Sequence, residues 1–74
     1  MATKTDLDVR IHLTVRNALV SLRSAQEILN AAGVHSKSTP KELRENWESI
    51  KSAAEQANQA TAALLYLKGL TDQE

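Results

Sequence analysis

The chain lacks cysteine and phenylalanine, and it has one tryptophan and one tyrosine among its 74 residues. Without cysteine there is no disulfide, no thiolate nucleophile and no cysteine-based metal site. Large aromatic side chains supply much of the apolar area in most cores, so their near absence predicts a small core. A chain of this length is close to the limit at which one core supplies enough stability, which favours a partner or self-association.

An excess of one charge and long apolar runs are also missing. Nine Lys and Arg residues balance nine Asp and Glu residues, so the chain has no general attraction to nucleic acid or to an anionic membrane. The longest apolar run, Ala62–Leu67, is too short to span a membrane, and residues 1–6 lack the apolar stretch of a signal peptide. We therefore expect a cytoplasmic protein with one domain, residues 1–74, that is frayed at both ends.

The few Pro and Gly residues indicate where helices begin and end. Thr39 is a suitable N-cap, Pro40 fits the first helical position, and Glu42 is placed to complete a capping box. Gly33 and Gly69 each follow a segment of helical periodicity, where a left-handed residue commonly ends a helix. The sequence therefore predicts an all-α fold, a two-helix antiparallel hairpin with helices at about 5–32 and 40–68.

The first of these segments carries two competing patterns. Residues 7–15 alternate between apolar and polar types, as in a strand. The same segment opens a series with helical spacing, and nothing else in the chain reads as a second strand, so we predict a helix and leave open whether it includes all of residues 7–15. The helical series is Leu7, Ile11, Val15, Ala18, Leu22, Ala25, Leu29 and Ala32.

The second segment has an apolar stripe of its own. Its residues are Leu43, Trp47, Ile50, Ala54, Ala57, Thr61 and Leu64, with Ala53, Ala60 and Leu65 beside them. We predict that the two stripes pack against each other and that Trp47 anchors the core. A loop of about six residues between the helices makes them antiparallel neighbours.

Several apolar residues belong to neither stripe. In a hairpin they fall together at the open end, away from the loop, and monomers rarely expose large contiguous apolar areas. The predicted partner-binding residues are Val9, Leu13, Val20, Ala63, Tyr66, Leu67 and Leu70. The alternative is that Val9, Leu13, Tyr66 and Leu67 complete a small cluster within the chain.

No catalytic or metal-binding motif is present in the sequence. His12 and His35 are far apart and lack the spacing of metal ligands, and there is no Gly-rich phosphate loop. We therefore expect no enzyme activity, no metal and no cofactor. Arg16 and Arg23 could form a phosphate-binding row, but Glu27 beside them and the zero net charge make a nucleic-acid-binding hairpin the weaker alternative.

The outline of the chain resembles a known family. A Thr/Asp-rich start, a helix, a tight polar loop and a second helix that contains Trp47 and ends in the stretch 60–69 (ATAALLYLKG) are similar to the YscE-like needle-subunit co-chaperones of bacterial type III secretion systems. The resemblance covers the architecture of the whole chain and about ten residues in detail. It implies a helical hairpin that pairs with a tetratricopeptide-like chaperone and holds a needle subunit in the cytoplasm, without catalysis or a cofactor. A homodimeric four-helix bundle, structural or regulatory, is the alternative.

Overall fold

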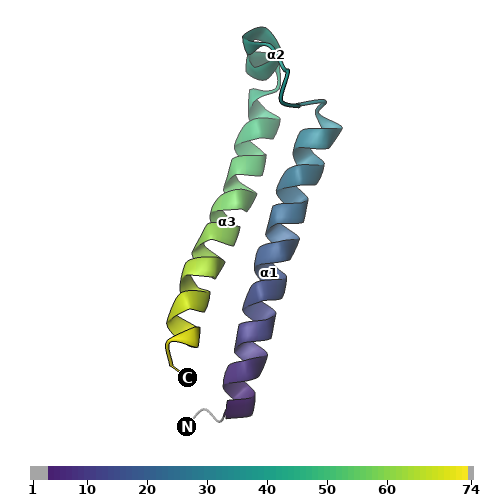
Figure 1. The fold of residues 1–74 in the computed structure, drawn as a ribbon. Helices are drawn as coiled ribbons and strands as arrows, with labels where there is room; N and C mark the ends of the chain where they lie inside the picture. Colours follow the sequence, from purple (N-terminus) through teal and green to yellow (C-terminus); the bar gives the residue numbers. More distant parts are fainter. Residues whose placement is uncertain (1–3, 74) are drawn as a thin grey trace.

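The protein is an antiparallel helical hairpin. The structure, a computed structural model, describes residues 4–73 and contains the helices α1 (Lys4–Ala31), α2 (Pro40–Glu45) and α3 (Trp47–Thr71). Helices α1 and α3 pack against each other along the long axis of a molecule of 53 × 18 × 16 Å (Figure 1). No strand occurs among the described residues, so the predicted all-α hairpin is confirmed, and residues 7–15 are helical throughout. The fraying predicted for the termini concerns residues that lie largely outside this range.

Gly33 ends α1 in the manner predicted. It has a φ of 74°, a conformation that only glycine adopts without strain. The Gly33 N–H donates to the Asn30 carbonyl at 3.1 Å, and the Val34 N–H donates to the Leu29 carbonyl at 2.9 Å. These two bonds define a Schellman motif, which turns the chain out of α1 and toward α2.

The predicted capping box is present at the start of α2. The Glu42 N–H donates to Thr39 Oγ1 at 3.2 Å, while the Thr39 N–H donates to Glu42 Oε1 at 3.2 Å. The Thr39 hydroxyl also donates to Glu42 Oε1, at 2.9 Å. Both hydrogen bonds from Thr39 favour the charged carboxylate, first the side-chain bond and then the backbone bond, so the pKa of Glu42 lies below its ordinary value.

The prediction of one continuous helix from 40 to 68 is wrong, because the helix is interrupted at Asn46. This residue has φ −107° and ψ 20°, and its side-chain amide donates to the Glu42 carbonyl at 2.9 Å. Asn side chains that bond nearby carbonyls in this way compete with the regular helical pattern. Figure 1 shows α2 as a separate turn at the loop end of the hairpin. The long second helix thus begins at Trp47 instead of Pro40.

Gly69 does not end the second helix, contrary to the prediction. Among the described glycines only Gly33 has a positive φ, and α3 continues through Gly69 to Thr71. The extra turn is closed by side chains: the Thr71 hydroxyl donates to the Lys68 carbonyl at 2.9 Å, and Lys68 Nζ forms an ion pair with Asp72 Oδ2 at 3.1 Å.

Candidate protein-binding face

Helices α1 and α3 meet along a row of mostly small side chains. Ala18 and Ala60 are each only 1% exposed. The one polar member of the row, Thr14, donates its hydroxyl to the Arg10 carbonyl at 2.7 Å and so is satisfied. We call the buried row the seam; it consists of Thr14, Ala18, Ala25, Ala53, Ala60 and Leu70.

The seam follows the period of a coiled coil. Ala18 and Ala25 are seven residues apart in α1, as are Ala53 and Ala60 in α3. A repeat of seven residues keeps one row facing the partner helix in a left-handed supercoiled pair. The other positions of the two repeats are half-buried: Leu7, Ile11, Ser21, Ile28 and Ala32 on the α1 side, and Asn46, Ser49, Gln56, Ala63 and Leu67 on the α3 side.

The predicted core stripes are therefore only partly correct. In α1 Thr14 is buried where the prediction placed Val15, which is half-buried, and the predicted Leu22 is exposed. Leu29 is half-buried, as is its neighbour Ile28. In α3 the predicted core anchor, Trp47, is 58% exposed, so that prediction is wrong. Both helices are rotated so that small residues face each other, because small side chains allow the two backbones to approach closely.

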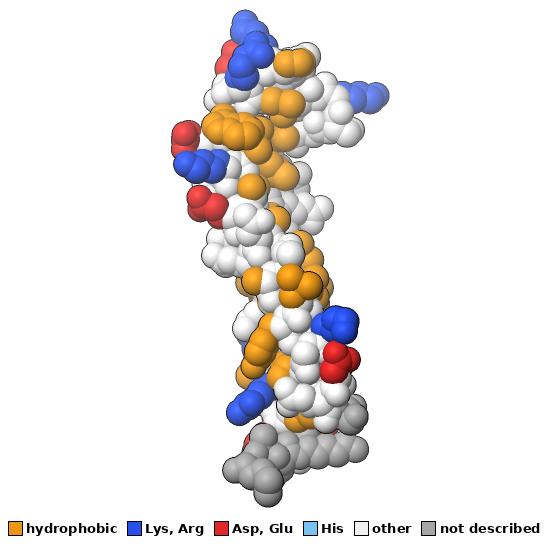
Figure 2. Space-filling model, turned by 90° about the vertical axis from the view of Figure 1, so that its left-hand side faces the viewer, with side chains coloured by type: hydrophobic (Ala, Val, Ile, Leu, Met, Phe, Trp, Pro, Cys, Tyr) orange, Lys and Arg blue, Asp and Glu red, His pale blue; other side chains and the backbone are white. Residues whose placement is uncertain are grey.

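Several apolar residues that the prediction placed in the core lie on one side of the hairpin, together with Leu19. The other exposed large hydrophobic residues, Val9, Leu13, Val20, Leu65 and Tyr66, lie elsewhere on the surface. The helices are antiparallel, so the heptad positions that directly follow the seam rows lie on the same side of the pair in both helices. We call this side the broad face; it comprises Val15, Leu19, Leu22 and Leu29 from α1 with Trp47, Ile50, Ala54, Ala57, Thr61 and Leu64 from α3. Leu19 and Trp47 are 61% and 58% exposed, and Leu22 and Leu64 are 44% and 46% exposed. In Figure 2 hydrophobic side chains form a band along most of the length of the molecule.

The total exposed area of the chain is larger than that of a compact monomer of the same mass. A compact monomer of 8.1 kDa is expected to expose about 4,500 Å². This chain exposes 5778 Å². The difference, roughly 1,300 Å², exceeds the area of about 800 Å² that each partner buries in a standard protein–protein interface. The elongated shape of the hairpin, 53 × 18 × 16 Å, accounts for an excess of this kind.

The predicted contact residues differ in how exposed they are in the structure. Val9, Leu13, Val20 and Tyr66 are exposed, whereas Ala63 and Leu67 are half-buried at the edge of the seam. Leu70 is 3% exposed and belongs to the interior, so it is not available to a partner, contrary to the prediction. By their heptad positions, Leu13, Val20 and Tyr66 lie on the flank opposite the broad face, among polar residues. The broad face is the larger apolar surface, and the prediction missed it because it assigned these residues to the core and gave Leu19 no role.

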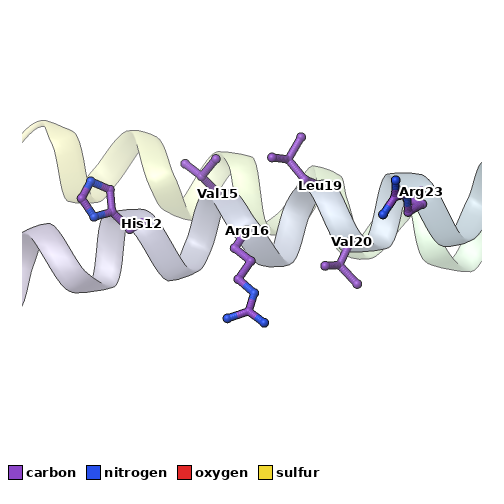
Figure 3. A pocket seen from close by; sticks show the side chains of 6 residues that line it. All are labelled: His12, Val15, Arg16, Leu19, Val20 and Arg23. Atoms are coloured by element: carbon purple, nitrogen blue, oxygen red, sulfur yellow. The ribbon is translucent and has the colours of Figure 1, made fainter.

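Two shallow hollows lie at the margin of the broad face. One is lined on α1 by Val15 and Leu19 together with His12, Arg16, Val20 and Arg23. Figure 3 shows Val15 and Leu19 pointing to one side of α1, with Arg16 and Val20 extending to the other. The second hollow, at the junction of α2 and α3, is lined by Pro40, Leu43, Arg44 and Trp47. In both hollows arginine side chains lie beside apolar ones.

The described residues hold no group of three His, Cys, Asp or Glu side chains that could bind a metal ion. His12 and His35 are both exposed, and His35 Nδ1 accepts a hydrogen bond from the Lys37 N–H at 3.1 Å. Among the helices in this range, none is long and apolar enough to cross a membrane. The largest feature left for a functional role is the broad face.

Comparison with known proteins gives no match: no family model, no curated protein and no solved structure is significantly similar to this chain. The functional argument therefore depends on the geometry of the hairpin.

Proposed function

We propose that this chain is a non-enzymatic protein-binding subunit that docks a helical partner on its broad face. The observation that carries the proposal is the placement of apolar residues by size. Alanines fill the seam, while Leu19, Leu22, Trp47 and Leu64 remain exposed on one side. Exposed aromatic and aliphatic side chains of this kind supply most of the binding energy in protein interfaces.

The specific role that we propose is that of a small co-chaperone. In the YscE-like family, which the chain resembles in outline, a hairpin pairs with a tetratricopeptide-like chaperone and stabilises a secretion-needle subunit in the cytoplasm. Repeat proteins of that type offer an extended concave surface made of helices. A 53 Å hairpin with an apolar side is a suitable shape for such a surface.

A homodimer is the second candidate, and the exposed broad face favours it as well. Two hairpins that pack their broad faces together would form a four-helix bundle, a common architecture for helical pairs with short connections. Sedimentation of the purified chain separates the two candidates. A monomer at micromolar concentration supports a different partner, whereas a stable dimer that buries Trp47 supports the bundle.

The test of the broad face is a double substitution, Leu19→Asp with Leu64→Asp, in a co-purification with the tetratricopeptide-like chaperone of the same secretion system. We expect the affinity to fall by roughly 100-fold or more, because two charges would enter the centre of the interface. Helicity measured by circular dichroism should stay unchanged, since both side chains are exposed.

The matched control is Leu13→Asp, which places the same charge on the opposite flank. It should leave binding intact. If Leu13→Asp abolishes binding and the double variant does not, the docking surface is the smaller patch around Leu13 and Tyr66. A chaperone that binds neither the wild type nor the variants would refute the co-chaperone role.

A further inference from the structure

The junction between α2 and α3 consists of a single residue, Asn46. Its φ is −107° and its ψ is 20°, and this ψ differs by about 60° from that of a regular helix. The helical bonding pattern continues on either side. The Asn46 N–H donates to the Glu42 carbonyl at 3.1 Å, and the Ile50 N–H donates to the Asn46 carbonyl at 3.0 Å. A change in the backbone angles of one residue therefore separates the bent junction from a straight one.

Helix α2 is held in its bent position by few contacts. None of its residues is buried, and within residues 4–73 it lies beside α3 and makes no contact with α1. Figure 1 shows α2 beyond the loop end of the two long helices. The bond that stabilises the bend, from the Asn46 side-chain amide to the Glu42 carbonyl at 2.9 Å, is exposed to solvent. The rest of the hairpin thus leaves α2 free to change direction.

The sequence around the junction fits a straight helix. Neither Gly nor Pro occurs in residues 41–68. Arg44 and Glu48 are four residues apart across the junction, a spacing that favours ion pairs on a continuous helix, yet in the described part of the chain these two form no ion pair. A straight junction would also pair the Trp47 N–H with the Leu43 carbonyl, a helical bond that the bend removes. The two forms therefore differ by a few weak interactions on each side.

We propose that Asn46 is a hinge and that α2 moves between the bent position and a straight extension of α3. Hinges are commonly a few residues at the ends of elements, where a change in φ and ψ is absorbed. The loop of residues 32–39 is long enough for both forms. When extended it spans about 26 Å, whereas the straight form requires a span of about 14 Å from the end of α1 to Pro40.

The hinge sets the length of the broad face. Around it Pro40, Leu43, Arg44 and Trp47 line a shallow hollow in the bent form. Their spacing of three, four and seven residues from Pro40 places them on one side of a straight helix. In the straight form Leu43 is therefore in line with Trp47, and the broad face is longer by about two turns. A helical partner that contacts both residues selects this form, a step that rests on the proposed protein-binding function, whereas the hinge itself does not.

The test measures one distance in the full chain. Since the chain has no cysteine, Lys41→Cys with Gln59→Cys creates two unique sites for spin labels. Both residues are exposed, and in a straight helix they lie on one side with Cα atoms about 27 Å apart. The bent form brings them closer together. We expect double electron–electron resonance to show two populations in this labelled chain, one near the straight-helix distance and one at a shorter distance.

Asn46→Ala should move the equilibrium toward the straight form. The change removes the side-chain bond to the Glu42 carbonyl and introduces the best helix former, so the ratio of the long to the short population should rise about tenfold. The Trp47 N–H should also exchange with solvent more slowly, since it gains the Leu43 carbonyl as an acceptor. Asn17→Ala is the matched control. Asn17 is exposed in the middle of α1, so the same change there should leave both populations unchanged.

The outcomes separate the hinge from the proposed function. A single short distance that Asn46→Ala leaves unchanged would mean a rigid bend and would overturn the inference. A single long distance would overturn it as well, because the bent form would then be absent. If both populations are present and the chaperone of the co-purification binds without raising the long one, the role of the hinge in docking is refuted. If that chaperone does not bind, the proposed function fails, while the distances in the free chain still decide the hinge.

Discussion

The seam and the broad face are built from the same two helices, yet they differ in the size of their side chains. The seam is mostly Ala, with Ala18 and Ala60 almost fully buried, whereas the broad face carries Leu19 and Trp47 with more than half of their surface exposed. A hairpin that folded for its own stability would place the large side chains inside, because burial of apolar area stabilises in proportion to that area. The opposite arrangement supports the proposal that the large side chains serve contacts outside the chain.

The largest effect is expected where the seam is overfilled. Ala18→Leu adds three carbon atoms to a position with 1% exposure, and extra atoms in a packed interior cost about 1–3 kcal/mol. For a domain of this size the melting temperature should fall by roughly 4–20 °C, as measured by circular dichroism. Ala54→Leu makes the same change on the exposed broad face and should leave the melting temperature within a few degrees. Equal losses in both variants would break the distinction between seam and face.

A smaller effect is expected when the broad face is trimmed. A buried Leu or Trp changed to Ala usually costs about 2–5 kcal/mol, but Leu19→Ala and Trp47→Ala should each change the free energy of unfolding by less than about 0.5 kcal/mol. The reason is that both side chains are mostly in water in the isolated hairpin. Urea unfolding followed by circular dichroism measures this. A loss above about 2 kcal/mol in either variant would show that the residue packs within the chain.

The two glycines should respond to alanine substitution in opposite directions. Gly33→Ala should destabilise by about 1–2 kcal/mol, because a φ of 74° forces a Cβ into the left-handed region. Gly69→Ala should instead stabilise α3 by about 0.5–1 kcal/mol, since Gly69 is inside the helix and an added Cβ would meet no atom within 4 Å. Thermal melts of both variants give the signs. A destabilising Gly69→Ala would mean that the helix ends where the sequence predicted.

The sequence predicted the end of α1 and the start of α2 better than it predicted which residues face each other. The capping box of Thr39 with Glu42 and the Schellman turn at Gly33 depend on residues a few positions apart, so local reasoning identifies them. The break at Asn46 was missed because an Asn within an otherwise helical pattern is a weak signal. Its effect depends on the bond from its side chain to the Glu42 carbonyl.

The orientation of the helices was missed for a different reason. A wheel that ranks residues by hydrophobicity selects Val15, Leu22 and Trp47 for the interior. The structure instead buries Thr14 and leaves Leu22 and Trp47 exposed, because close approach of two backbones requires small side chains. The apolar pattern of the sequence therefore includes two groups of residues. One group packs against the neighbouring helix, and the other lies on the solvent-facing side. Hydrophobicity alone does not separate them.

The narrow seam has a consequence for how long the unbound chain survives. Alanine loses almost no side-chain entropy when it is buried, but it also contributes little area, so the free hairpin is held by a small net free energy. A ligand that binds only the folded form raises stability by RT ln(1 + [L]/Kd), about 2.7 kcal/mol at a hundredfold excess over Kd. Proteases that act on the open chain would then remove copies without a partner first. Under the proposed function, the amount of this protein would therefore follow the supply of its partner.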